Sequence, residues 1–154
     1  DSMTQERLKE ILPNLPSTVK YDSKSLADFI FWNTFETGLR SAFAVVEKAW
    51  GAELHIVNND KYCMKYLMLW RGGRLGRHFH KIKHETFFIV GGNVEATVGN
   101  EVSYLSDGQK LDIPIGTEHT LLAYRNTAIL EVSTHDYVDD SYRLEPYSNY
   151  DPTI

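Results

Sequence analysis

Short apolar runs separated by turn residues fill the chain after residue 50, and this pattern is typical of strands. Gly99-Asn100 lies between two such runs and predicts a two-residue hairpin turn. The predicted strands span residues 52–57, 62–70, 86–90, 94–98, 101–105, 109–113, 119–123 and 128–133. Eight strands with short connections and no helical pattern between them predict an antiparallel sandwich or barrel.

Before residue 50 the apolar residues recur at helical spacing instead. They predict a helix over residues 4–12, and Ser25 with Asp28 resembles a capping box that opens a second helix. The pattern over residues 41–46 fits either the end of this second helix or a first strand. The sequence therefore predicts three parts: a helical extension over residues 1–49, a β domain over residues 50–135, and a tail over residues 136–154 that packs on that domain.

The composition narrows the class of protein. With 154 residues, 42% hydrophobic and 12% aromatic, the chain fits one folded domain and not a disordered segment. The net charge of −5 argues against nucleic acid, whose binders carry basic surfaces. No run of about 18 apolar residues is present, so we expect no membrane span. The single cysteine, Cys63, excludes an internal disulfide and predicts a reducing, cytoplasmic location.

Three histidines and one glutamate form a pattern that points to metal chemistry. His78 and His80 are two residues apart, so on an extended strand their side chains share one face. Glu85 follows His80 after a four-residue connection, and His119 follows a proline–glycine turn. A lone histidine would be an ordinary surface residue, but this set can converge on one cation. Three imidazoles and a carboxylate suit manganese, iron, cobalt, nickel or zinc, and we expect manganese first.

These residues resemble the two sequence motifs of the cupin superfamily. The first motif has the spacing Gly72, five residues, His78, one residue, His80, four residues, Glu85, six residues and Gly92. The second has the spacing Gly108, five residues, Pro114, one residue, Gly116, two residues and His119. Ala123 replaces the asparagine that usually ends the second motif, but that asparagine is no metal ligand in the family. The resemblance covers residues 50–135 and implies a mainly β fold, the cupin jelly-roll barrel, also called a double-stranded β-helix.

A narrower resemblance concerns the small sugar-isomerase cupins, which include D-lyxose isomerase-like proteins and the cupin module of mannose-6-phosphate isomerases. It is carried by residues 50–53, 58–59, 62–65, 80–87, 131–135 and 140–143. His84 lies where relatives often have an acidic residue. The resemblance implies a metal-dependent aldose–ketose isomerase for a sugar or sugar phosphate. It also implies a homodimer.

The same resemblance implies candidate proton-transfer residues. In those isomerases a lysine two residues before the ligand glutamate and a glutamate on a late strand move the proton, and Lys83 and Glu131 match them. Burial would raise the pKa of Glu131, and a divalent cation would lower that of Lys83. Lys65 is a third candidate, because it interrupts an apolar strand. The alternatives are a solvated Lys83, a salt-bridged Lys65 whose stem packs on apolar surface, and a Glu131 paired with Lys65 or Arg143.

The motifs leave the function open, because cupins carry many chemistries. A dioxygenase could use the same four ligands, and a non-catalytic cupin could bind a small polar ligand there. A phosphorylated substrate would need a cationic side chain at the mouth of the cavity. The candidates are Arg71, Arg74, Arg77 and Arg143, and we expect Arg77 to point away from the metal because its strand parity is opposite to that of His78.

Overall fold

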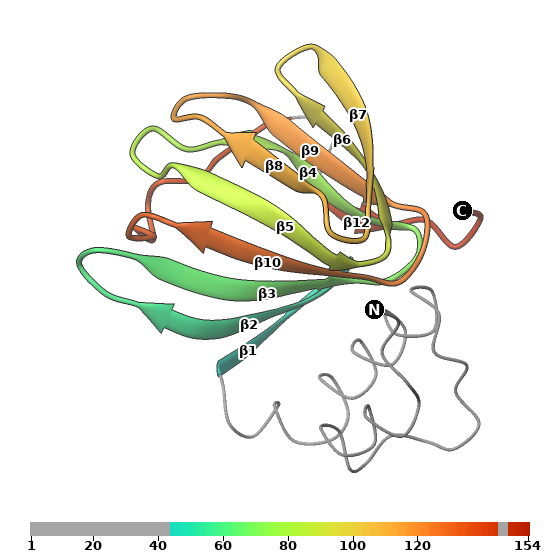
Figure 1. Cartoon of the computed structure of the whole chain (residues 1–154), viewed down its shortest axis with the longest axis horizontal. Coiled ribbons are helices and arrows are strands. Elements are labelled where there is room, and N and C mark those ends of the chain that lie inside the picture. Colours follow the sequence, from blue (N-terminus) through green and yellow to red (C-terminus); the bar gives the residue numbers. More distant parts are fainter. Residues whose placement is uncertain (1–43, 145–147) are drawn as a thin grey trace, which may run out of the picture.

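The computed structural model describes residues 44–144 and 148–154, and all of its regular secondary structure in these ranges is β (Figure 1). The prediction of a mainly β fold is confirmed. The two predicted helices lie outside the described residues. Within the described ranges, no helix is long and apolar enough to cross a membrane.

Two six-stranded antiparallel sheets face each other (Figure 1). The first has the order β1 (Ala44–Lys48), β2 (Gly51–Asn58), β3 (Cys63–Leu69), β10 (Thr127–Ser133), β5 (Glu85–Gly91) and β8 (Lys110–Ile113). The second has the order β11 (Tyr142–Arg143), β4 (Gly73–Phe79), β9 (His119–Ala123), β6 (Asn93–Val98) and β7 (Glu101–Ser106), and β12 (Asn149–Tyr150) also pairs with β4. Neighbouring strands that are distant in sequence, such as β3 and β10, give the jelly-roll topology that the cupin motifs predict.

The eight predicted strands are confirmed, and the described residues contain four more, β1, β4, β11 and β12. The open pattern over residues 41–46 resolves as a strand from Ala44 onward, because β1 pairs with β2. The strand β4 was not among the predicted strands, since its buried positions carry glycine and histidine as well as Leu75. Gly73 is required there, because a Cβ would lie 2.5 Å from the carbonyl oxygen of Trp50.

The tail contributes strands to the second sheet. Both β11 and β12 pair with β4, so residues after 135 extend this sheet. The strand β1 likewise extends the first sheet before residue 50. The division of the chain at residues 49/50 and 135/136 stays a prediction.

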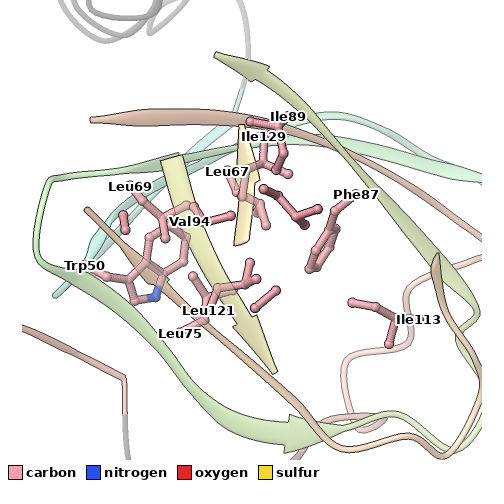
Figure 2. Packing of buried hydrophobic residues seen from close by; sticks show 13 residues of the cluster. Trp50, Leu67, Leu69, Leu75, Phe87, Ile89, Val94, Ile113, Leu121 and Ile129 are labelled. Carbon is pink, nitrogen blue, oxygen red and sulfur yellow. The ribbon is translucent and has the colours of Figure 1, made fainter. Parts of the chain in front are cut away.

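The core lies between the two sheets. Figure 2 shows large apolar side chains from both sheets pointing toward one another, among them Leu67, Phe87, Leu121 and Ile129. Along β5, residues Glu85, Phe87 and Ile89 are buried, while Phe88 between them is exposed. This alternation places Glu85 on the same inner face as the core residues. The buried polar residues of the barrel therefore lie directly beside its apolar core.

The apolar core supplies the first testable prediction. Ile129 is fully buried in the core cluster, so Ile129→Ala should lower the free energy of unfolding by about 2–5 kcal/mol through lost burial and a residual cavity. Val132 lies on the same strand and is 47% exposed. Val132→Ala is the matched control in urea unfolding, and equal effects of the two substitutions would contradict this description of the core.

Candidate active site

The four predicted ligand residues meet inside the barrel. His78 lies on β4 opposite His119 at the start of β9, His80 follows β4 directly, and Glu85 begins β5. One ligand atom from each residue lies within 4.8 Å of the others, and all four side chains are buried. The spacing of the two cupin motifs therefore brings these residues together, and their role as metal ligands stays a prediction.

Backbone carbonyls orient all three imidazole rings. The Nδ1 atoms of His78, His80 and His119 lie 2.7, 2.8 and 2.9 Å from the carbonyl oxygens of Gly76, Asp140 and Thr117. A carbonyl oxygen can only accept, so each Nδ1 carries the proton and donates. Each Nε2 then has a free lone pair, which is the tautomer that metal-ligating histidines adopt.

The Nε2 atoms supply a direct test of whether a cation fits. Those of His80 and His119 are buried and lie 3.4 and 2.9 Å from Oε1 of Glu85, yet they form no hydrogen bond with any described residue. Facing lone pairs in a buried site are costly unless a proton or cation lies between them. The donor set therefore fits a divalent cation.

One of the imidazoles, that of His78, is also in the charge state that a metal requires. Burial and neighbouring His119 together lower the pKa of His78 to about 3. At neutral pH His78 is therefore neutral, and its nitrogen can bind a cation without first losing a proton.

A lysine lies among three carboxylates beside the ligand cluster. The Nζ of Lys83 is 3.2 Å from Oε2 of Glu85, 3.3 Å from Oε2 of Glu131 and 3.5 Å from Oδ1 of Asp136. Lys83 and Glu131 are both 4% exposed. The sequence alternative of a solvated Lys83 is therefore wrong, and the partner of Glu131 is Lys83, which the sequence did not suggest.

Lys65 forms a second, adjoining set of ion pairs. It faces Glu131 across the β3–β10 pairing, bonds to Oδ2 of Asp136, and lies 3.7 Å from Oε1 of Glu53. The salt-bridged reading of Lys65 is thus confirmed, and this residue links the cavity wall on β2 to the tail. Sequence reasoning missed Asp136 and did not assign Glu53 a place in the site.

Carboxylates and ammonium groups lie together beside the ligand cluster. Glu85 and Glu131 are buried with Lys65 and Lys83, so these four charges balance when all are ionised. The half-buried Glu53 and Asp136 pair with Lys48, Lys65 and Lys83. Glu85 is the carboxylate that faces both the histidines and Lys83.

The two groups of the Lys83–Glu131 pair differ in their acidity. Burial and the charge of Glu85 together raise the pKa of Glu131 to about 7, against the opposing effect of the lysines. Burial would lower the pKa of Lys83, but Glu131, Glu85 and Asp136 outweigh it and raise that pKa. Glu131 is consequently suited to exchange a proton near neutral pH, and Lys83 to remain a cation. The expectation that a bound divalent cation lowers the pKa of Lys83 stays a prediction.

A cavity of about 450 Å³ opens onto this cluster. Its wall includes His78, His80 and Glu85 together with both lysines. Lys48, His55 and Arg143 also line it. Arg77 instead lies 2.8 Å from Glu118, away from the ligand cluster as predicted. Of the four arginines considered as a phosphate handle, Arg143 is the one among the described residues that lines this cavity.

A bound cation should stabilise the fold, which gives a second prediction. Ligand at about 100 times its dissociation constant adds roughly 2.7 kcal/mol. For a chain of this size that raises Tm by about 5–10 °C. Calorimetry of chelator-treated protein with and without added Mn²⁺ measures the shift, and Ca²⁺, which prefers six to eight oxygen ligands, is the control. Identical Tm values with and without Mn²⁺ would contradict a cation site at this cluster.

Comparisons with known proteins agree with this description. The family model for the C-terminal part of mannose-6-phosphate isomerase matches residues 37–146. The chain is 30% identical over 112 residues to a mannose-1-phosphate guanylyltransferase of Salmonella muenchen, covering 68% of this chain and 23% of that protein. It is 30% identical over 107 residues to the xanthan biosynthesis protein XanB of Xanthomonas campestris pv. campestris (strain B100), covering 65% and 22%. This chain therefore spans less than a quarter of the length of these relatives.

Solved structures share the fold at low sequence identity. KdgF from a Halomonas species superimposes with a TM-score of 0.60 and 16% identity, over 65% of this chain and 93% of that chain. An RmlC-like cupin from Shewanella frigidimarina superimposes with a TM-score of 0.60 and 13% identity, over 68% and 93%. These similarities establish the cupin jelly roll and say nothing about the reaction.

Proposed function

We propose a function on the following premise: the chain belongs to the mannose-6-phosphate isomerase C-terminal family and has the cupin fold. Our proposal is that it is a metal-dependent aldose–ketose isomerase that acts on a sugar or sugar phosphate. The observation that carries the proposal is the Lys83–Glu131 pair, buried 3.3 Å apart beside three histidines and Glu85. A metal-binding cupin without proton transfer would not need this pair.

The proposed ligands are His78, His80, Glu85 and His119. A divalent cation bound there would polarise the carbonyl and neighbouring hydroxyl oxygens of the substrate and stabilise the negative charge that develops on them. These four residues would hold the cation and leave it open to the two substrate oxygens. We further propose manganese as the metal, which is one of the first-row cations, with iron, cobalt, nickel and zinc, that three nitrogens and one oxygen can bind.

Glu131 is the proposed base. For an aldose, its carboxylate takes the proton from C2 while Lys83 donates a proton to the carbonyl oxygen at C1. The C2 hydroxyl then returns a proton to Lys83, and Glu131 delivers its proton to C1, which gives the ketose. Both residues end in the protonation state in which they began. Their pKa shifts fit these roles, because both are upward: Glu131 titrates near neutral pH and Lys83 stays charged.

Lys65 has a supporting role in this proposal. Its ammonium group pairs with Asp136 and Glu53, and its charge lowers the pKa of Glu131 against the effect of burial. Lys65 would thereby hold Asp136 against Lys83 and keep Glu131 from remaining permanently protonated. We also propose that the protein acts as a homodimer in the cytoplasm, as the resemblance and the single cysteine respectively suggest.

The test is a substrate screen with the metal as a variable. Metal-stripped protein would be incubated with pentoses, hexoses and their terminal phosphates in D₂O, with and without Mn²⁺. The expected result is Mn²⁺-dependent aldose–ketose interconversion with deuterium incorporated at C1 or C2, read by NMR. Metal binding without interconversion of any of these sugars would contradict the isomerase proposal, and oxygen uptake would identify a dioxygenase instead.

A further inference from the structure

We propose that Asp140, in the tail after β10, is a positioning residue that holds the metal centre in shape. This inference rests on the metal-binding part of the proposed function. The Asp140 side chain is not exposed to solvent as a tail residue would be, since the residue is 2% exposed. It lies against the connection between β4 and β5, which separates the candidate ligands His80 and Glu85.

The carboxylate of Asp140 accepts hydrogen bonds from three consecutive backbone amides. Oδ1 accepts from the amide of Lys81 at 2.8 Å, and Oδ2 accepts from the amide of Lys83 at 2.9 Å. The amide of Ile82 lies 3.2 Å from both oxygens. Successive amides that converge on one anion form a concave binding site for it, and a charged acceptor makes such bonds strong. The carboxylate therefore fixes the path of the chain between the two ligands.

The backbone of the same residue orients a ligand directly. The carbonyl oxygen of Asp140 accepts the Nδ1 proton of His80 at 2.8 Å, which aims the opposite ring nitrogen at the cluster. The carbonyl of Asp140 thus orients the ring of His80. The Asp140 side chain fixes the backbone that connects His80 to Glu85. It also positions the backbone of Lys83, whose amine contacts Glu85 and Glu131.

The tail is itself anchored on both sides of Asp140. Before it, the side chain of Asn58 exchanges two hydrogen bonds of 3.0 Å with the backbone of Asp136. After it, Tyr142 pairs with Phe79 at the end of β4. The backbone on both sides of Asp140 is therefore held in place. The hydrogen bonds of Asp140 can thus restrict the position of the connection between His80 and Glu85.

The experiment compares Asp140→Asn with the matched control Asp139→Asn in the full-length chain. The side-chain amide introduced by Asp140→Asn would present its nitrogen toward at least one backbone N–H, so at least one of the three bonds is lost. Asp139 is exposed. Each metal-free protein would be titrated with Co²⁺ and followed by calorimetry and by visible absorption, because the absorption reports the number and arrangement of ligands. Amide hydrogen exchange at residues 81–83 would be measured without metal.

We expect Asp140→Asn to weaken Co²⁺ binding by about 10–100-fold, the usual range for residues that orient ligands. We also expect an altered Co²⁺ spectrum and faster exchange at residues 81–83, with an unchanged control. A residue that only stabilised the fold would lower Tm and leave the spectrum and affinity of the folded protein intact, which would overturn the inference. The inference is also overturned if Asp140→Asn binds Co²⁺ as the wild type does. The proposed function stands in that case. If the wild type binds no Co²⁺, both the inference and the proposed function fail.

Discussion

Replacing Glu131 with glutamine is expected to lower kcat by about 10²–10⁴-fold, the usual contribution of a general base, without loss of metal. Glutamine has nearly the same shape but cannot take a proton. Glu131 is not one of the four clustered ligand residues, so the cation site should survive the change. Isomerase assays together with metal analysis of the purified variant measure both quantities.

The control for this prediction is Glu101→Gln, because Glu101 is an exposed glutamate on β7. It should leave both kcat and metal content unchanged. Loss of metal from Glu131→Gln would show that Glu131 is a ligand, and retention of full activity would remove it from the mechanism. Lys83→Gln should lower kcat in the same way, since it removes the proton donor.

The same assignment fixes the direction of the pH dependence. A base must be ionised to act, and burial raises the pKa of Glu131 to about 7 in the protein alone. A bound cation would lower this value somewhat. We therefore expect kcat/KM to fall as pH decreases, with a midpoint at or below about pH 7 and above the ordinary range of a carboxyl group. A profile that is flat from pH 4 to 8 would contradict the role of Glu131.

Replacing Glu85 with glutamine is expected to abolish metal-dependent activity by weakening cation binding more than about 100-fold, which exceeds the cost of losing an orienting residue. Glu85 supplies the single carboxylate of the ligand cluster. A neutral amide in its place would remove this negative charge from the site, and with it much of the attraction for a divalent ion. Calorimetric titration of Mn²⁺ into wild type and variant measures the difference.

Glu101→Gln again serves as the reference for this change, because it removes one negative charge from the surface. Undiminished Mn²⁺ affinity in Glu85→Gln would mean that the cluster does not bind the cation through this carboxylate. Full activity in the variant without any bound metal would contradict the metal-dependent mechanism itself, because the reaction would then not need a cation at this cluster.

The four residues of the ligand cluster could be predicted from the sequence. His78 and His80 are two residues apart on one strand, so period-two geometry alone predicts their common face. Glu85 and His119 follow from the cupin spacing, which records how the strands of that fold meet. The strand period together with the spacing of the cupin motifs was therefore enough to predict which four residues form the cluster.

The polar surroundings of the cluster could not be predicted in the same way. Asp136 and Asp140 lie in a tail whose alternation and composition give no sign of burial, and they reach the site because β11 pairs with β4. Without a cation the pKa of Lys83 is raised, since Glu131 and Asp136 approach it from distant segments. Long-range pairing determines these contacts, and no local pattern encodes it.

The strand β4 illustrates a limit of hydrophobic patterning in the fold itself. Three of its buried positions carry Gly73, Gly76 and His78 in place of large apolar residues. Gly73 lies close to Trp50, and His78 is a candidate ligand. A strand that serves a functional site in this way loses the apolar alternation by which strands are recognised.

The central position of β10 has a consequence for biosynthesis. Among the described residues this strand is the last long one, yet it lies between β3 and β5 and hydrogen-bonds to both. While the ribosome is still translating residues before 127, β3 and β5 each have an open edge toward the missing strand, and such edges invite pairing with other chains. Nascent or prematurely terminated chains should therefore depend on chaperones until β10 has been made and has joined the sheet.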